Sequence, residues 1–211
     1  MVYASEVQGK KLTFQVSGML WQRSLVMRDL ETGSLWSHIL GECMRGELEG
    51  EELELIPAEM TTWKQWRADH PDTTILDMSP TAKRFDSEFY RDPAKFVYGV
   101  KVAGQPKAYP FPYLEKHPVV QETIAEVPVL VAFEKESSST VIFDPGELRF
   151  ADQLRDGKLI EKKTGSRFDP STGICTSGSL EGDALKKLDG IISYRRAWQE
   201  FYPASKIAGT K

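Results

Sequence analysis

An internal repeat constrains the fold of this chain more than any other sequence feature. TGSLWSHILGECMRGELEGEEL at residues 32–53 returns as TGSRFDPSTGICTSGSLEGDAL at residues 164–185, at an offset of 132 without a gap. The same offset continues as far as Pro71 and Pro203. Twelve of the forty positions aligned between residues 32–71 and 164–203 are identical, where chance would give about two or three. Self-similarity of this kind predicts two copies of one supersecondary unit.

Short runs rich in β-branched and aromatic residues predict that each copy is built mainly from strands. AGQP at residues 103–106 predicts a tight turn between two of them. The predicted strands are residues 11–16, 24–30, 96–102, 127–134 and 140–144.

Each copy is expected to end in a short helix. In the second copy, Tyr194, Ala197, Trp198 and Phe201 follow helical spacing, with Ser193 as the predicted N-cap. The first copy offers TTWKQWRADHP at residues 61–71, with Trp66 at the position of Trp198. Both tryptophans are predicted to lie in the core, because large aromatic side chains on a helix face usually do.

The repeat also sets the expected domain boundaries. They are a first repeat at residues 1–77, a polar linker at 78–95, a second repeat at 96–203 and a frayed tail at 204–211. Val2-Tyr3 aligns with Ile142-Phe143, so residues 96–139 have no partner in the first half. The first unit is therefore expected to be incomplete, and self-association through its unpaired edges is predicted.

Composition excludes several classes of protein. The net charge of −4 provides no basic footprint for nucleic acid, and there is no run of about 18 apolar residues to span a membrane, so neither partner is expected. Two cysteines are too few for a secreted disulfide framework. The sequence as it begins at Met1 has no signal core and predicts a cytoplasmic protein, or an extracytoplasmic one if the natural chain begins upstream.

Several long motifs, in order, resemble an uncharacterised domain-of-unknown-function family, number 3179. They include FQVSGML at 14–20, TTWKQWRADHPDT at 61–73, VYGVKVAGQPKAYP at 97–110 and HPVVQETI at 117–124. The resemblance implies a Tyr-Cys-x-x-Cys segment just ahead of the position of Met1, which this sequence lacks. Its counterpart in the second repeat, residues 131–134, has no cysteine.

A more distant resemblance connects TGSRFDPSTGICTSGSL with the second cluster-binding box of Rieske iron–sulfur proteins. The glycine turns, Phe168, Asp169 and the Thr172-Gly173 pair match that box, but the ligands do not. Glu161 and Thr164 stand where cysteine and histidine are needed, and Asp29 and Thr32 stand there in the first repeat. The resemblance implies two tandem Rieske-like units with no cluster, no metal and no other cofactor.

The loops that correspond to the cluster box are the expected recognition surface. Candidate ligand-facing residues on them are Arg28, Asp29, Trp36, His38, Glu161 and Asp169. Cys43 and Cys175 occupy equivalent positions. They could form a symmetric thiol or metal pair, but the interpretation we favour is that they are small buried residues. The acidic run at residues 46–59 lacks a calcium-loop pattern and is expected to be a solvated face.

No nucleophile elbow, P-loop or dinucleotide fingerprint is present, so no catalytic residue is predicted. The leading hypothesis is a non-enzymatic binding or accessory protein on a cluster-free Rieske-like scaffold. The alternative is a truncated form of a redox or metal-handling protein whose cysteine segment lies upstream of Met1. An enzyme that uses carboxylates such as Asp29 and Glu161 is a third hypothesis.

Overall fold

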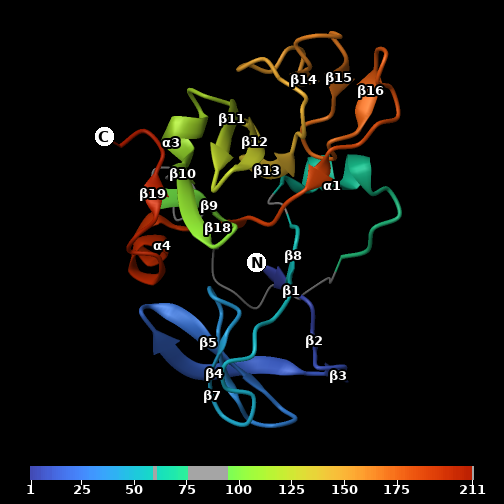
Figure 1. Cartoon of the computed structure of the whole chain (residues 1–211). Coiled ribbons are helices and arrows are strands. Elements are labelled where there is room, and N and C mark those ends of the chain that lie inside the picture. The colour runs from blue at the N-terminus through green and yellow to red at the C-terminus, as the bar shows by residue number, and fades with distance from the viewer. Residues whose placement is uncertain (59–60, 76–94, 211) are drawn as a thin grey trace, which may run out of the picture.

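The computed structural model describes residues 1–58, 61–75 and 95–210. Within these residues the protein is mainly β, as the sequence predicts, and its three helices are short: α1 (Trp63–Asp69), α3 (Phe111–Leu114) and α4 (Arg195–Phe201). None of the three is long and apolar enough to cross a bilayer. Figure 1 shows an N-terminal part, residues 1–58, at one end of the molecule and a C-terminal part, residues 96–210, at the other.

The N-terminal part consists of three small antiparallel groups of strands. β4, β5, β6 and β7 form a four-stranded sheet in sequence order, while β1 pairs with β8 and β2 pairs with β3. Their core contains Leu12, Trp36, Cys43 and Leu53, and Phe14 meets the Trp36 ring edge-on. The bounds are β1 (Val2–Tyr3), β2 (Glu6–Val7), β3 (Lys10–Lys11), β4 (Phe14–Trp21), β5 (Ser24–Asp29), β6 (Leu35–Ser37), β7 (Cys43–Arg45) and β8 (Leu55–Ile56).

The C-terminal part contains two four-stranded sheets and one three-stranded sheet. The strand orders are β18-β9-β10-β19, β11-β12-β13-β17 and β14-β15-β16. The bounds are β9 (Phe96–Val102), β10 (Gln105–Pro110), β11 (Val119–Ile124), β12 (Val127–Glu134), β13 (Ser139–Asp144), β14 (Leu159–Ile160), β15 (Arg167–Phe168), β16 (Cys175–Ser177), β17 (Lys186–Lys187), β18 (Ile191–Tyr194) and β19 (Lys206–Ile207).

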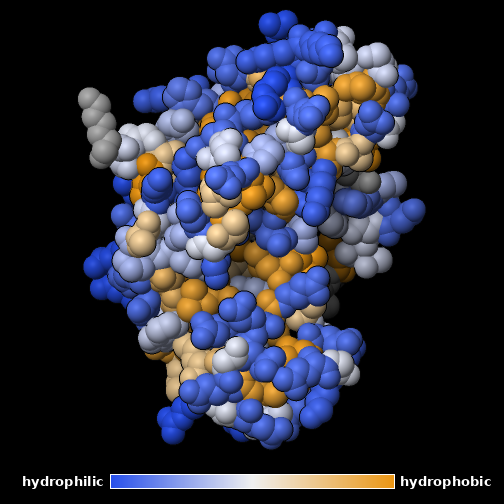
Figure 2. Space-filling view, in the orientation of Figure 1, coloured by the Kyte–Doolittle hydropathy of each residue, from blue (hydrophilic) through white to orange (hydrophobic). Residues whose placement is uncertain are grey.

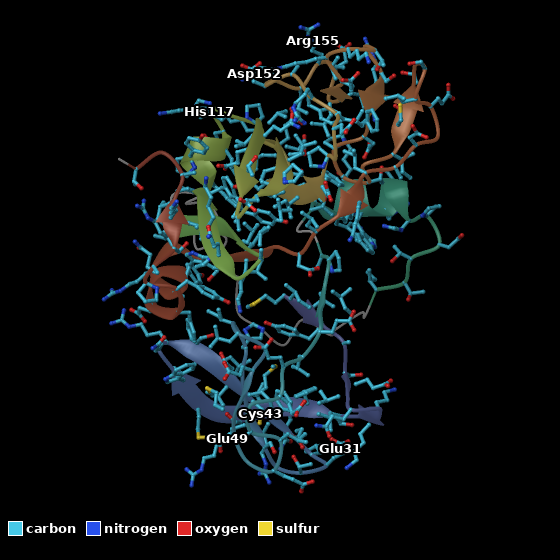
Figure 3. The ribbon with its side chains drawn as sticks, in the orientation of Figure 1. Glu31, Cys43, Glu49, His117, Asp152 and Arg155 are labelled. Carbon is cyan, nitrogen blue, oxygen red and sulfur yellow. The ribbon has the colours of Figure 1, made fainter. Side chains whose placement is uncertain are left out.

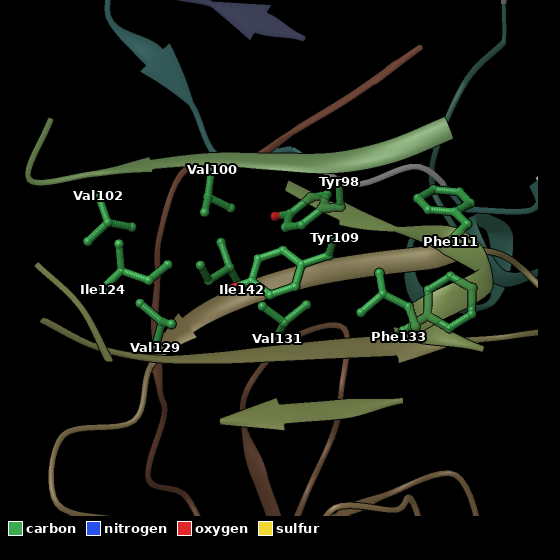
Figure 4. Close-up of a cluster of buried hydrophobic side chains, with 11 residues drawn as sticks. Tyr98, Val100, Val102, Tyr109, Phe111, Ile124, Val129, Val131, Phe133 and Ile142 are labelled. Carbon is green, nitrogen blue, oxygen red and sulfur yellow. The ribbon is translucent and has the colours of Figure 1, made fainter. Parts of the chain in front are cut away.

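The two four-stranded sheets enclose the largest apolar cluster of the protein. Side chains from β9 and β10, such as Val100 and Tyr109, meet side chains from β11 to β13, such as Val131 and Ile142 (Figure 4). Nearly all of these side chains are buried. The strands that carry them are rich in apolar residues because their inner faces pack against each other. Ala103 and Gly104, both with positive φ, form the predicted tight turn between β9 and β10.

The two repeated segments make the same backbone hydrogen bonds. Gly46 and Gly178 have φ of 122° and 106°, and a Cβ atom on either would lie 2.7 or 2.8 Å from the Cα of Ser34 or Ser166. Only glycine fits so close an approach of two backbones. The matching bonds include Gly41 to Ser37 and Gly173 to Asp169, Cys43 to Glu51 and Cys175 to Asp183, and Leu53 to Gly41 and Leu185 to Gly173.

The two C-terminal helices of the repeats occupy equivalent positions in sequence but different surroundings. Trp198 on α4 is 1% exposed, whereas Trp66 on α1 is 37% exposed, so the predicted core role of Trp66 is wrong. The ring of Trp198 packs against Gly99 of β9, where a larger side chain would not fit. β9 belongs to residues 96–139, which have no counterpart in the first half, so Trp66 has no equivalent strand to pack against. Trp66 instead stacks on His70, with 4.0 Å between ring centroids.

Two further predictions differ from the structure. Ser193 lies in β18, and the N-cap of α4 is Tyr194, without a side-chain cap. Residues 204–210 are not a frayed tail, because β19 pairs in parallel with β10 and Ala208 donates to the carbonyl of Ala108. The predicted linker lies outside the described residues, apart from Lys95.

The N-terminal and C-terminal parts share an apolar interface. Ile39 from the N-terminal part packs with Val97, Ile191 and Trp198 from the C-terminal part. At the tip of the β4–β5 hairpin, Trp21 meets Phe201 of α4 edge-on, with 5.1 Å between ring centroids. α4 is therefore the element that joins the two parts.

We predict that Trp198→Ala lowers the free energy of unfolding by about 3–5 kcal/mol, the usual range for removing a large aromatic side chain from a core. Urea denaturation measures the change. Trp63→Ala is the matched control, because Trp63 is exposed and should cost less than about 1 kcal/mol. Equal costs for the two substitutions would contradict this account of the interface.

Candidate functional site

The carboxylate of Asp29 holds the loop between β5 and β6 together. It accepts hydrogen bonds from the indole N–H of Trp36 at 2.8 Å, from the backbone N–H of Thr32 at 2.6 Å and from that of Gly33 at 3.1 Å. The hydroxyl of Thr32 also lies 2.6 Å from that of Ser34. Asp29, Ser34 and Trp36 are all buried.

Glu161 does the same in the loop between β14 and β15. Its carboxylate accepts from the backbone N–H of Thr164 at 2.6 Å and from the Thr164 hydroxyl at 2.7 Å. The oxygen of that hydroxyl also lies 2.9 Å from the hydroxyl of Ser166, which repeats the Thr32–Ser34 contact of the other loop. Lys163 supplies a further backbone donor. We call these two groups the carboxylate networks.

Each carboxylate is stabilised in its charged form. Burial alone would raise the pKa of Asp29, but the hydrogen bonds from Trp36, Thr32 and Gly33 outweigh burial and lower it below its ordinary value. Burial would likewise raise the pKa of Glu161, but hydrogen bonds from Thr164 and Lys163 outweigh burial and lower that pKa.

The structure therefore places Asp29, Trp36 and Glu161 inside the loops and not on a ligand-facing surface. They were expected to face a ligand because the Rieske pattern exposes its cluster there. All three are buried, and the two carboxylates accept hydrogen bonds from the backbone of their own loops, which they therefore position.

The remaining candidate residues lie at the surface or partly below it. Arg28 is exposed and its guanidinium lies over the Gly33 turn. His38 is half-buried, and burial followed by the charge of the N-terminus lowers its pKa. Asp169 pairs with Lys158 at 2.8 Å and accepts from the backbone of its own turn, so it too has a structural role. The structure does not bring these residues together at one site.

Cys43 and Cys175 are free and buried, one in the core of each part (Figure 3 labels Cys43). They lie in separate apolar clusters, so they do not form a symmetric thiol pair. Burial raises the pKa of the Cys43 thiol. Across the described ranges, no group of three or more His, Cys, Asp or Glu side chains could hold a metal ion.

A cleft between the two parts gathers polar residues that the sequence did not single out. Its volume is about 310 Å³. The N-terminal part contributes Tyr3, Glu52 and Glu54, and the C-terminal part contributes Lys101, Asp189, Trp198 and Tyr202. Sites for small ligands often lie at such junctions, and a cleft of this size is at the small end of their range.

The walls of the cleft are held rigidly. The phenol of Tyr3 donates to the carbonyls of His38 at 2.9 Å and Ile39 at 3.2 Å. The indole of Trp198 donates to Ser205 at 2.7 Å, and its ring packs on Tyr202 with 4.3 Å between centroids. Aromatic faces and edges are therefore fixed before any ligand arrives.

The charged side chains that line the cleft are mainly acidic. Burial and the nearby charge of Glu54 raise the pKa of Asp189. Burial, with the charges of Glu52 and Glu42, raises the pKa of Tyr202. Three lining carboxylates face a single lining ammonium, that of Lys101. Such a site favours a cation and disfavours an anion.

One part of this cleft left a signal in the sequence. Glu52 and Glu54 belong to the acidic run at residues 46–59, and Leu53 and Leu55 alternate with them at strand spacing. Asp189 and Tyr202 lie more than 130 residues further along the chain and have no local pattern of their own. The site depends on the docking of the two parts, which no motif encodes.

Comparison with protein families accounts for the motifs noted above. The family model described as "Protein of unknown function (DUF3179)" matches residues 1–95 and 84–211. The chain belongs to this family. The match extends over nearly the whole chain and confirms the resemblance that the sequence motifs indicated. The description of the family assigns no activity to its members. No curated protein and no solved structure matches the chain.

We predict that Asp29→Ala lowers the free energy of unfolding by about 3 kcal/mol or more, because it leaves the buried Trp36 N–H and two backbone donors without their acceptor. Urea denaturation again gives the measurement. Glu49→Ala, an exposed carboxylate in the same part, should change stability by less than about 0.5 kcal/mol. A cost for Asp29→Ala as small as that of the control would refute the role given to this network.

The same network predicts a specific dependence on pH. The pKa of Asp29 is lower in the folded protein than in the unfolded chain, so its contribution is fully present above the unfolded pKa of about 3.9. That contribution is lost as the pH falls through the folded pKa. As the pH is lowered, the free energy of unfolding should therefore fall less steeply in Asp29→Asn than in the natural protein. Parallel curves for the two proteins would argue against this role of Asp29.

Proposed function

We propose that this protein is a non-enzymatic binding protein, and that its ligand is a small molecule or side chain with an ammonium or guanidinium group. The cation would enter the cleft between the two parts and approach Glu54 and Asp189. The single observation that supports this proposal most strongly is that three carboxylates, those of Glu52, Glu54 and Asp189, line the cleft together with one ammonium, that of Lys101.

A cation in this cleft would relieve repulsion that already exists there. Glu54 and Asp189 come from different parts of the chain and are brought together at one wall. A ligand cation between them would form charge-assisted hydrogen bonds, which are stronger than neutral ones. The rings of Trp198 and Tyr202 would add a cation–π contribution and contact the apolar body of the ligand.

We further infer that the scaffold is a duplicated Rieske-like unit that needs no cluster. The shared hydrogen bonds of the two loops and the two Gly–Ser approaches support a common origin. The β1–β8 pairing of Tyr3 with Leu55 is also matched by the β13–β17 pairing of Phe143 with Lys187. On this interpretation the carboxylate networks stabilise loops that the cluster stabilises in Rieske proteins.

We predict that n-butylammonium and n-butylguanidinium shift the amide resonances of the cleft, and that butyrate at the same concentration does not. Two-dimensional ¹⁵N-labelled NMR titration gives the site and the dissociation constant together. Asp189→Asn and Glu54→Gln should each weaken binding about tenfold, because each removes one charge-assisted contact. Affinity should also fall as the pH drops through the raised pKa of Asp189, since the protonated acid no longer attracts a cation.

Glu181→Gln is the matched control, because Glu181 is an exposed carboxylate of the C-terminal part that does not line the cleft. It should leave the dissociation constant unchanged. If butyrate shifts the same resonances as the amines, or if the control weakens binding as much as Asp189→Asn, the cleft is not a cation site.

A further inference from the structure

The β4–β5 hairpin exposes apolar side chains to an unusual degree. Val16 is 69% exposed, Met19 44% and Leu20 73%. β4 carries no charged residue, and it is an edge strand of its sheet. Edge strands are normally protected by charges or proline, so this edge is suited to contact with something apolar.

The corresponding hairpin in the C-terminal part is shorter. It runs from Phe150 to Glu161, and its turn at Asp156-Gly157 has the same positive φ angles as the turn at Gln22-Arg23. The β4–β5 hairpin spans 16 residues from Phe14 to Asp29, whereas its counterpart spans 12 from Phe150 to Glu161, and Met19 and Leu20 lie near the tip of the longer hairpin. The extension therefore adds a surface that the shared core does not need.

A cationic cavity of about 430 Å³ lies at the tip of the hairpin. Its walls include Arg23 from the hairpin, Lys95 at the entry to β9, and Arg195 and Arg196 from α4. Among the described residues that line it there is no carboxylate. Arg196 also pairs with Glu200 along the helix, at 3.5 Å and with the arginine largely in solvent.

The apolar hairpin and the cationic cavity form one neighbourhood. The contact between Trp21 and Phe201 fixes the hairpin tip against α4 and so brings Arg23 close to Arg195. In Figure 1 the tip of the β4–β5 hairpin lies directly below α4, and in Figure 2 hydrophobic side chains are visible over part of the hairpin, among hydrophilic ones.

We propose that this surface docks on an anionic lipid bilayer. The apolar hairpin would enter the boundary between headgroups and acyl chains, and the arginines would contact the lipid phosphates. Apolar burial and basic residues together are the two signals that peripheral binding needs. The sequence expectation of no membrane partner rested on the lack of an apolar span, and a docking surface does not require one.

Charge complementarity favours this occupant over others. The protein as a whole has a net charge of −4, yet this cavity is lined by cations alone among its charged residues. A second copy of the chain docked through the same face would bring the same arginines together and repel them. A soluble anion would account for the arginines but not for the exposed hairpin.

Co-sedimentation with vesicles tests the proposal. The full chain is mixed with vesicles of phosphatidylcholine alone and with vesicles containing phosphatidylglycerol, at low and high salt. We expect binding to the anionic vesicles, weakened by salt because the basic contacts are screened. Leu20→Glu and Arg23→Glu should each reduce the partition coefficient about tenfold or more.

Two control substitutions lie elsewhere. Ile174→Glu replaces an exposed apolar residue, and Arg155→Glu reverses a charge in the shorter hairpin, far from the N-terminal part (Figure 3). Both should bind as the natural protein does, and thermal unfolding of all four variants checks that they are folded.

Absence of binding to the anionic vesicles would overturn the proposal. So would a loss of binding in the controls equal to that in Leu20→Glu. Binding of soluble glycerol phosphate with the same affinity and the same sensitivity to Arg23→Glu, but not to Leu20→Glu, would show a free-anion site instead. A dimer in analytical ultracentrifugation that Leu20→Glu abolishes, without vesicle binding, would assign the hairpin to self-association.

Discussion

The hydrogen bonds accepted by one buried carboxylate in each part position much of the rest of this structure. Asp29 binds the Trp36 indole and the backbone of its loop, and Trp36 in turn is the centre of the N-terminal core. Glu161 binds its loop in the same way, next to Phe168 in the other core. A charged group is costly to bury unless its lone pairs are satisfied. These loops satisfy them with local donors, so a tight turn and a core side chain are fixed together.

The equivalence of the two segments ends where the extra strands begin. β9 to β12 lie ahead of the second repeated segment and have no counterpart ahead of the first. They provide the sheet on which α4 packs and the inner face opposite β13. α1, with a similar sequence, does not have these partners, and its tryptophans are exposed. Two segments of similar sequence therefore form the same local turns, but burial depends on the strands that surround each segment.

The sequence predicted those features that depend on local chemistry. Four of the five predicted strands and both helices exist, because alternating β-branched residues and proline-bounded helical spacing act over a few residues. The fifth predicted strand, residues 11–16, is divided between β3 and β4. The cysteines are buried, as small apolar side chains usually are. The exposure of Trp66, the pairing of β19 with β10 and the cleft at Asp189 were not predicted, since each depends on contacts between residues far apart in the chain. The ligand-facing role given to Asp29 and Glu161 differed from the structure because a motif records residue type and spacing, while the direction of a side chain depends on its local donors.

The contact of α4 with the N-terminal part links the two proposed surfaces. One face of α4 presents Trp198 to the acidic cleft, and its first turn presents Arg195 to the cationic cavity. The apolar packing of Ile39 against Trp198 and of Trp21 against Phe201 separates these two regions of opposite charge. Opposite potentials on a protein of small net charge persist only if they are kept apart by more than about one Debye length or by a low-dielectric wall. The helix and its aromatic contacts supply that wall, so the same residues that join the two parts also allow a cleft lined mostly by carboxylates and a cavity lined by arginines to exist side by side.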